Sequence, residues 1–230
     1  MGRYVIACST PWFWEVWEQS EQPRGKWVEV RDGQLTAEFL ESIEPRYVFF
    51  PHWSQIVPPD ILERWECVCF HSTPVPYGRG GSPVQNMIAR GNTDTDVTAL
   101  RMVTEVDAGP VYLREPVSLL GGGDEVFIRI GRVIAGMIPR IAATEPNPTP
   151  QEGEVVQFRR RDPTQSRLPS DGSLEDLLDF IRMLDARGYP AAFAEVGPWR
   201  LEFRRPALRP GGIETDVWIT RREDSDDVAH

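Results

Sequence analysis

The sequence predicts an α/β fold: a mostly parallel sheet in a main domain over residues 1–145, then a small α+β unit over residues 152–222. Two observations predict it. Short apolar runs alternate with helical patterns through the first two-thirds of the chain, which is typical of βαβ units. Residues 145–150 then hold three prolines, which cannot continue a helix or a sheet, so this stretch is expected to link the two units.

Strands of the main domain are expected where the apolar runs are compact, because a buried parallel strand favours a continuous run. Between them, Thr36 is expected to cap a short helix, Pro59 to begin a second, and Ser82 to cap a third at Pro83. Asp124 is expected to cap a long amphipathic helix. The expected strands cover residues 4–8, 27–30, 47–50, 67–70, 97–103 and 111–117, and a loop is expected at residues 9–12.

The second unit begins with a helix whose ends are well marked. Ser173 is expected to cap it, leucines follow at helical spacing, and Gly188 is expected to end it. Three strands are then expected, near residues 192–196, 200–204 and 216–220. Residues 223–230 are polar, so they are expected to fray.

Composition narrows the classes of protein to which the chain can belong. The formal net charge of −10 argues against a nucleic-acid partner, because such proteins need clustered Lys and Arg to displace counterions. No apolar window is long enough to cross a bilayer, and Pro11 and Glu15 interrupt the apolar N-terminus, so neither a membrane partner nor a signal peptide is expected. Three cysteines do not make a disulfide framework. We therefore expect a cytoplasmic protein that acts on small molecules.

Chemistry is expected in the loops that follow the carboxyl ends of the strands, because ligands bind there in open α/β sheets. These loops hold His52 and His71, two of the three histidines, and cover residues 9–12, 51–54 and 71–81. Taken alone, His71 is interpreted as a structural histidine that ends a strand and bonds to the backbone. Asp107 is interpreted in the same way as an ordinary turn residue. The glycine-rich turn at residues 78–81 is by itself a weak signal for an anion site.

Four segments nevertheless follow one another in a distinctive order: Cys69-Phe70-His71, Val75-Pro76-Tyr77-Gly78-Arg79-Gly80, Asp96-Val97-Thr98 and Asp107-Ala108-Gly109. In this order they resemble the methionyl-tRNA formyltransferase superfamily, and within it most closely the sugar N-formyltransferases. That family carries Asn-any-His, then Leu-Pro, two residues and Arg-Gly, then Gly-Val-Thr and an Asp-any-Gly turn. The resemblance covers residues 45–140 well, and residues 158–166 and 188–193 more loosely.

The resemblance implies a Rossmann-like formyltransferase fold and an N-formyltransferase activity. Its co-substrate would be 10-formyltetrahydrofolate, and its acceptor the amine of a nucleotide-linked amino sugar. His71 and Asp107 are the implied acid/base and oxyanion-stabilising pair. Cys69 is assigned to the same catalytic group because it occupies the register of the family's Asn, although a thiol is a weaker donor than an amide. No metal is expected, and a homodimer is left open.

The remaining implied contacts divide between the two substrates. The loop with His52, Trp53 and Ser54 corresponds to the loop that lies along the folate in the resembled family, and Val106 is assigned to the same ligand. Ser9, Thr10 and Trp12 follow the first strand and are expected to contact the acceptor, as are Arg79 and Gly80. For Arg79, contact with a phosphate and support of its own loop stay equally open.

Three other functions also stay open. Water in place of the amine would make the chain a formyltetrahydrofolate hydrolase, which steady release of formate without an amine would indicate. Loss of the family's Asn would leave a weakened folate or nucleotide-sugar binding protein, which a large gain of activity in Cys69→Asn would indicate. Finally, Cys67, Cys69 and His71 share one face of a strand and could bind a metal, with His52 as the fourth ligand.

Overall fold

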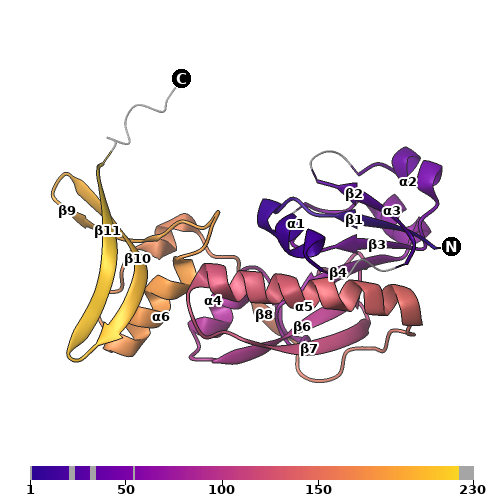
Figure 1. The fold of residues 1–230 in the computed structure, drawn as a ribbon. Coiled ribbons are helices and arrows are strands. Elements are labelled where there is room, and N and C mark those ends of the chain that lie inside the picture. The colour runs from indigo at the N-terminus through magenta and orange to yellow at the C-terminus, as the bar shows by residue number, and fades with distance from the viewer. Residues whose placement is uncertain (1, 21–23, 32–34, 54, 223–230) are drawn as a thin grey trace.

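The computed structural model describes residues 2–20, 24–31, 35–53 and 55–222 (Figure 1). Its main sheet has six strands, in the order β2 (Lys26–Val30), β1 (Arg3–Ala7), β3 (Tyr47–Phe50), β4 (Cys67–His71), β6 (Asp94–Arg101) and β7 (Val111–Ser118). A separate antiparallel sheet has the order β11 (Gly212–Arg221), β10 (Trp199–Arg209) and β9 (Ala192–Val196). The first four strands of the main sheet are parallel, whereas β6 runs antiparallel to β4, and β7 antiparallel to β6. The predicted fold class, a mostly parallel α/β sheet followed by a small α+β unit, is confirmed.

Strands and helices alternate along the first part of the main domain. The strands are β1 (Arg3–Ala7), β2 (Lys26–Val30), β3 (Tyr47–Phe50), β4 (Cys67–His71), β6 (Asp94–Arg101) and β7 (Val111–Ser118). The helices are α1 (Pro11–Glu18), α2 (Ala37–Ile43), α3 (Pro59–Arg64), α4 (Pro83–Ile88) and α5 (Gly123–Thr144). Within the described ranges, no helix has the length and apolar character needed to cross a membrane.

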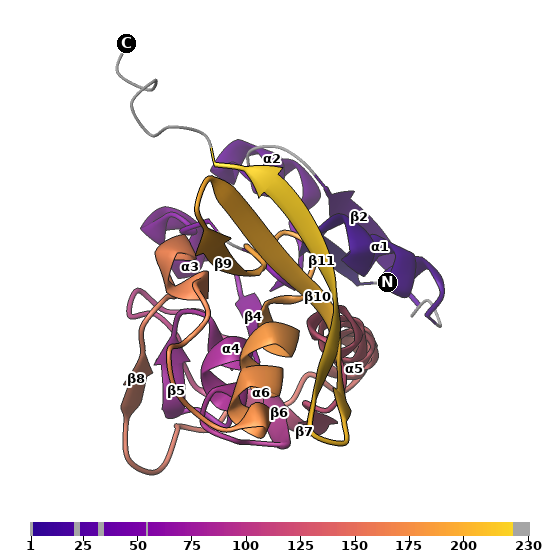
Figure 2. The ribbon, with the colours of Figure 1, turned by 90° about the vertical axis from the view of Figure 1, so that its left-hand side faces the viewer.

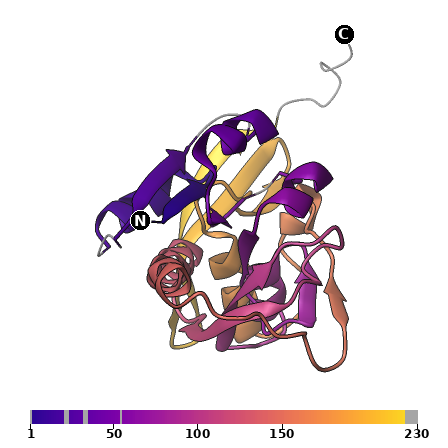
Figure 3. The same cartoon turned by 90° about the vertical axis from the view of Figure 1, so that its right-hand side faces the viewer.

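Helices cover both faces of the main sheet. Ile6 and Phe49 point to one face and join the larger core with side chains of α1 and α5, whereas Val5 and Phe50 point to the other face and pack with α2 and α3. Figure 3, which looks along α5, shows this helix lying against the sheet. Because neighbouring residues of β1 and β3 fill two different cores, these strands are apolar from Tyr4 to Ala7 and from Tyr47 to Phe50.

The C-terminal unit packs one helix, α6 (Leu174–Leu184), against its sheet (Figure 2). The Ser173 hydroxyl accepts a bond from Asp176 N at 3.0 Å, so the predicted cap is confirmed. Buried Arg182 donates to the carbonyls of Leu119 and Gly121, at 2.5 and 3.0 Å, and fixes α6 to the connection between β7 and α5. The other elements are η1 (Pro163–Ser166), β9 (Ala192–Val196), β10 (Trp199–Arg209) and β11 (Gly212–Arg221).

A small two-stranded sheet joins the segment after the proline-rich linker to the main domain. β5 (Tyr77–Gly80) pairs in parallel with β8 (Val156–Phe158), and Figure 2 shows them side by side. At Gly80 a Cβ would stand 2.3 Å from the Phe158 carbonyl oxygen, so this close pairing requires glycine. β8 thus lies within residues 152–222, the range expected for the small unit, yet pairs with the main domain.

The structure differs from the sequence prediction at several element ends. The loop expected at residues 9–12 is shorter, because Pro11 begins α1, a helix that the sequence did not predict. Ser82 stands at the N-cap of α4 but makes no side-chain cap bond, because it adopts a left-handed φ of 50°. Gly122, rather than Asp124, is the N-cap of α5. β5 and β8 were also not predicted, since strands of four and three residues show no usable periodicity.

Candidate active site

His71 ends β4 and lies between two acceptor groups. Its side chain is 9% exposed, its Nε2 atom is 2.7 Å from the Gly78 carbonyl oxygen, and its Nδ1 atom is 3.5 Å from Asp107 Oδ2. Carbonyl and carboxylate oxygens only accept hydrogen bonds, so a neutral ring can donate to one of them and a protonated ring to both. The ring is therefore placed to take up and release a proton.

Asp107 reaches His71 from a turn that folds back toward β4. The turn occupies residues 102–110 between β6 and β7, and Asp107 adopts a φ of 55°, which is uncommon for residues other than glycine. Its Oδ2 atom accepts a hydrogen bond from Gly80 N at 2.9 Å. The structure therefore brings together three of the residues singled out in the sequence, since one carboxylate oxygen faces both His71 and Gly80.

Cys69 lies two residues before His71, on the same face of β4. Burial raises the pKa of its thiol, and the nearby Asp107 carboxylate raises it further. Burial also raises the pKa of Cys67 to about 12. Both side chains therefore stay protonated near neutral pH, and a protonated thiol is neither a good nucleophile nor a metal ligand. Among the residues that the structure describes, no three His, Cys, Asp or Glu side chains gather closely enough to hold a metal, so the metal alternative gains no support.

His52 follows β3, and its ring packs against the rings of Trp12, Phe13 and Phe127. The Trp12 ring is nearest, with the ring centroids 4.6 Å apart. Burial lowers the pKa of His52 to about 4, so the ring is neutral at physiological pH. Neither His52 Nε2 nor Trp53 Nε1 has a hydrogen-bond partner among the described residues, although both atoms are buried. Unpartnered buried nitrogens are uncommon; contact of His52 and Trp53 with a folate stays a prediction. Ser54 lies outside the described residues.

The other predicted contacts surround this loop. Ser9 and Thr10 donate from their hydroxyls to the His52 carbonyl, at 3.4 and 3.3 Å, so they hold the loop in this structure. Val106 precedes Asp107 and is 68% exposed. Contacts of Ser9, Thr10 and Trp12 with an acceptor, and of Val106 with a folate, stay predictions.

Arg79 is buried, and each of its three guanidinium nitrogens contacts a neighbouring side chain. Nε and Nη2 donate to Gln151 Oε1, at 3.1 and 2.9 Å, and Nη1 lies 3.2 Å from Glu105 Oε1. This geometry favours the second interpretation of Arg79, that it holds its own loop; contact with an acceptor stays a prediction. Gln151 was not found from the sequence, because nothing in the pattern distinguishes it from the other polar residues that follow the linker.

Four arginines belong to two segments that meet beside the loop that carries Gly80. Arg159, Arg160 and Arg161 follow β8, and Arg90 follows α4, whose residue Asn86 bonds to both segments: its Nδ2 donates to the Arg159 carbonyl and its Oδ1 accepts from Arg90. None of the four forms an ion pair with any described carboxylate. In a chain with a net charge of −10, such a group of unpaired cations is a candidate anion site.

The buried His52 is expected to make the protein sensitive to acid. Its pKa is about 4 in the folded chain against 6.5 when solvated, so the unfolded state binds the proton more readily between these values. Stability should fall as the pH drops below about 6.5, by about 2 kcal/mol at pH 5. His52→Gln should remove this part of the slope, measured by urea unfolding from pH 7 to 4.5; equal slopes in both proteins would contradict it.

Comparison with known proteins shows the family to which the chain belongs. The family model described as formyl transferase matches residues 20–126, and the one described as methionyl-tRNA formyltransferase, C-terminal domain, matches residues 163–220. The structure of a methionyl-tRNA formyltransferase from Clostridium thermocellum is 37% identical, with a TM-score of 0.92, over 96% of this chain and 100% of that chain.

Two more distant structures show the shared fold. HypX from Aquifex aeolicus in complex with tetrahydrofolic acid is 18% identical, with a TM-score of 0.74, over 96% of this chain and 44% of that chain. A sugar N-formyltransferase from Shewanella is 14% identical, with a TM-score of 0.66, over 91% of this chain and 99% of that chain. The chain spans about half the length of the curated relatives it matches, which are methionyl-tRNA formyltransferases. On this fold, these matches and the residues brought together around His71, the chain belongs to the formyltransferase superfamily.

Proposed function

We propose that this chain transfers the formyl group of 10-formyltetrahydrofolate to the amine of a nucleotide-linked amino sugar. The observation that carries the proposal is the contact between His71 Nδ1 and Asp107 Oδ2 at the end of β4. An imidazole next to a carboxylate can move protons near neutral pH, which acyl transfer to an amine requires. Membership of the formyltransferase superfamily supports the reaction, and the structural likeness to a sugar N-formyltransferase is compatible with the acceptor.

10-Formyltetrahydrofolate supplies the electrophilic formyl carbon. The attacking amine loses one proton as its new C–N bond forms, and the leaving nitrogen gains one as its bond to the same carbon breaks. Asp107 is placed to accept the first proton and His71 to deliver the second, since Nδ1 and Oδ2 are 3.5 Å apart and such contacts tighten when substrates bind. If Nε2 exchanges the Gly78 carbonyl for the substrate, His71 can also donate to the formyl oxygen as charge develops there. The Cys69 thiol, which keeps its proton, adds at most a weak donor.

The arginine group supports a diphosphate-bearing acceptor. Arg159 and Arg160 have no carboxylate partner in the described chain, and Arg160 is packed against Gly81, where a Cβ would stand 2.5 Å from the Arg160 Cα. Gly81 directly follows Gly80, whose N–H bonds to Asp107. A diphosphate held by these arginines would therefore place an attached sugar next to the catalytic pair, and guanidinium groups are well suited to phosphate.

Methionyl-tRNA is the second candidate acceptor. The observation that favours it is the 37% identity, over nearly all of this chain, to the Clostridium thermocellum structure. Against it stands the net charge of −10, because a protein that binds a long phosphate backbone needs an extended basic surface.

Mass spectrometry of acceptors incubated with 10-formyltetrahydrofolate distinguishes these functions. We expect a nucleotide-linked amino sugar to gain one formyl group, and methionyl-tRNA to gain none at equal protein concentration. The double variant Arg159→Ala/Arg160→Ala should raise the KM for the sugar nucleotide by ~10- to 100-fold, as expected for lost charge-assisted hydrogen bonds. The control Arg205→Ala/Arg209→Ala removes two exposed arginines of the C-terminal hairpin and should leave the KM unchanged.

Other outcomes of the same screen would overturn the proposal. Formylation of methionyl-tRNA alone would assign the second candidate, and steady formate release without any amine would assign a hydrolase. Saturable binding of folate with neither product would indicate a protein that binds without catalysis. Association into a homodimer stays a prediction.

A further inference from the structure

Gln151, the first residue after the proline-rich linker, bonds through its side chain to the turn at residues 102–110 and to β5. Its Nε2 donates to the carbonyl of Asp107 and to that of Gly109, both at 2.8 Å. Its Oε1 accepts from two nitrogens of Arg79, at 3.1 and 2.9 Å. Both amide protons and the amide oxygen are therefore used, so the orientation of the Gln151 amide is determined by its partners.

The linker itself is anchored next to this contact. Thr149 and Val111 exchange two backbone hydrogen bonds, N to O at 2.7 and 2.9 Å, which ties the segment before Gln151 to the start of β7. Gln151 therefore reaches the turn at residues 102–110 from a fixed backbone. On the other side, Arg79 belongs to β5, whose Gly80 donates to the Asp107 carboxylate.

The turn needs such support because of how Asp107 is held. A φ of 55° is unfavourable for Asp relative to its common conformations, so the residue keeps it only while its surroundings enforce it. Two groups enforce it here: Gly80 N holds the carboxylate, and Gln151 Nε2 holds the main-chain carbonyl. Without the second contact, rotation of the peptide would carry the carboxylate away from His71.

We propose that Gln151, braced by Arg79, is a positioning residue that sets the distance between Asp107 and His71. The inference rests on the proposed roles of these two residues and extends them to a side chain that touches neither substrate. The Nδ1–Oδ2 separation of 3.5 Å is already longer than a usual N–H···O bond. A further displacement of about 1 Å in a catalytic group can lower a rate ~100-fold. Gln151 therefore acts on turnover rather than on substrate affinity.

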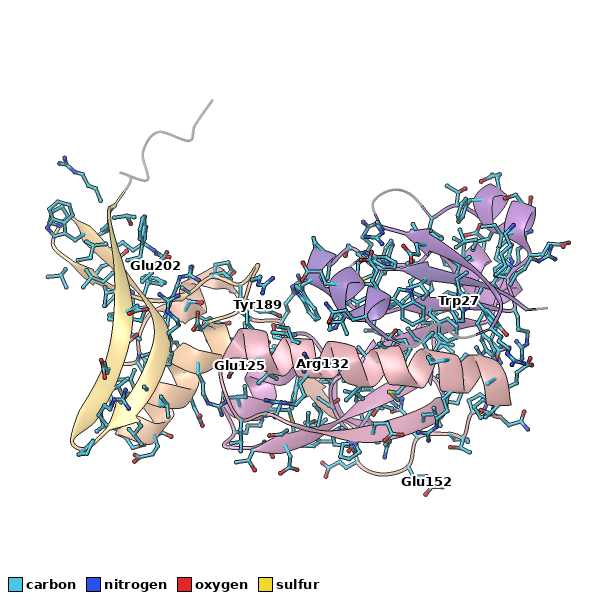
Figure 4. All side chains as sticks on the ribbon, in the orientation of Figure 1. Trp27, Glu125, Arg132, Glu152, Tyr189 and Glu202 are labelled. Carbon is cyan, nitrogen blue, oxygen red and sulfur yellow. The ribbon has the colours of Figure 1, made fainter. Side chains whose placement is uncertain are left out.

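Kinetics provide the first test. Gln151→Leu keeps the approximate size but removes every hydrogen bond, and should lower kcat by ~10- to 100-fold with each KM within about twofold of the parent. Gln151→Glu keeps an acceptor for Arg79 but places carboxylate oxygens against two carbonyls, so it should lose at least as much. The matched control is Glu152→Leu, the neighbouring exposed side chain that projects from the lower loop in Figure 4. Unchanged kcat in Gln151→Leu, or a loss confined to KM, would overturn the inference.

A second test does not depend on the acceptor. The chain has only three histidines, so the side-chain ¹H–¹⁵N signals of His71 can be resolved by NMR and assigned with His71→Asn. Asp107→Asn and Gln151→Leu should shift the Nδ1 signal in the same direction, whereas Glu152→Leu should leave it in place. A signal that moves in Asp107→Asn but not in Gln151→Leu would show that Gln151 does not position Asp107. If no acceptor in the screen is formylated but Gln151→Leu still moves the signal, the proposed function fails and this inference stands.

Discussion

Replacing His71 with Asn is expected to lower the rate of formyl transfer by ~10²- to 10⁴-fold, the usual range for loss of a positioned acid/base group. Asp107→Asn, which keeps the size and removes the charge, should cause a loss of the same order. The two residues share one contact, from Nδ1 to Oδ2, so the double variant should be scarcely slower than either single variant. Single-turnover measurements with saturating substrates would give these rates without a contribution from product release.

Folding must be shown to survive in these variants. Far-UV circular dichroism and the urea midpoint should stay near those of the parent for His71→Asn. Asp96→Asn is the matched control, because Asp96 lies on β6 outside the His71 contacts and should keep full activity. Near-normal turnover in either His71→Asn or Asp107→Asn would remove the pair from the mechanism.

Gly109→Ala, which adds one methyl group to the turn at residues 102–110, is expected to lower the stability of the protein strongly. A Cβ at Gly109 would lie 1.7 Å from the carbonyl oxygen of Arg101, the last residue of β6, which pairs with β4 on one side and β7 on the other. The turn must therefore move away, which would also break the Gln151 bond to the Gly109 carbonyl. We expect a loss of about 2–3 kcal/mol in the free energy of unfolding, the scale of overpacking in a fixed core. A large fall in kcat should accompany it, because Asp107 lies two residues away.

Gly136→Ala provides the matched control for this variant. Gly136 is an exposed residue of α5, and a Cβ there would meet nothing within 4 Å. Alanine is the better helix former by about 0.5–1 kcal/mol, so this change should stabilise the protein and leave activity unchanged. If Gly109→Ala were as stable and as active as the parent, the close approach of the turn to Arg101 would be wrong.

The sequence alone predicted the parts of the fold that depend on local pattern. The apolar run that ends at His71 predicted β4, and the capping sequence at Ser173 predicted α6 with its correct first residue. β5 and β8 were missed, because three or four residues that pair at long range carry no periodicity of their own. α1 was missed because Pro11 suggested a loop, whereas Pro at the first helical position favours a helix.

The site was predicted in its residues but not in its geometry. Spacing could not bring Asp107 to His71, because β6 runs antiparallel to β4 and the turn after it folds back, and only the family resemblance joined the two residues. Gln151 was missed because its role depends on two backbone carbonyls, which are present at every residue and leave no trace in the pattern. The buried environment that lowers the pKa of His52 also comes from side chains distant in sequence, such as Phe127.

The parallel pairing of β5 with β8 decides where a chimera could join the catalytic domain of this protein to the C-terminal unit of a relative. A joining point within the proline-rich linker would replace both Gln151 and β8. The turn that carries Asp107 would lose the Gln151 contact, and β5 would lose its paired strand. A seam placed after Arg161 would keep these contacts and the arginines beside Gly81, and would replace the 3-10 helix, α6 and the three-stranded sheet beyond them. The first eleven residues after the linker, 151–161, therefore belong with the catalytic domain, and the remainder of the chain is the part that relatives could exchange.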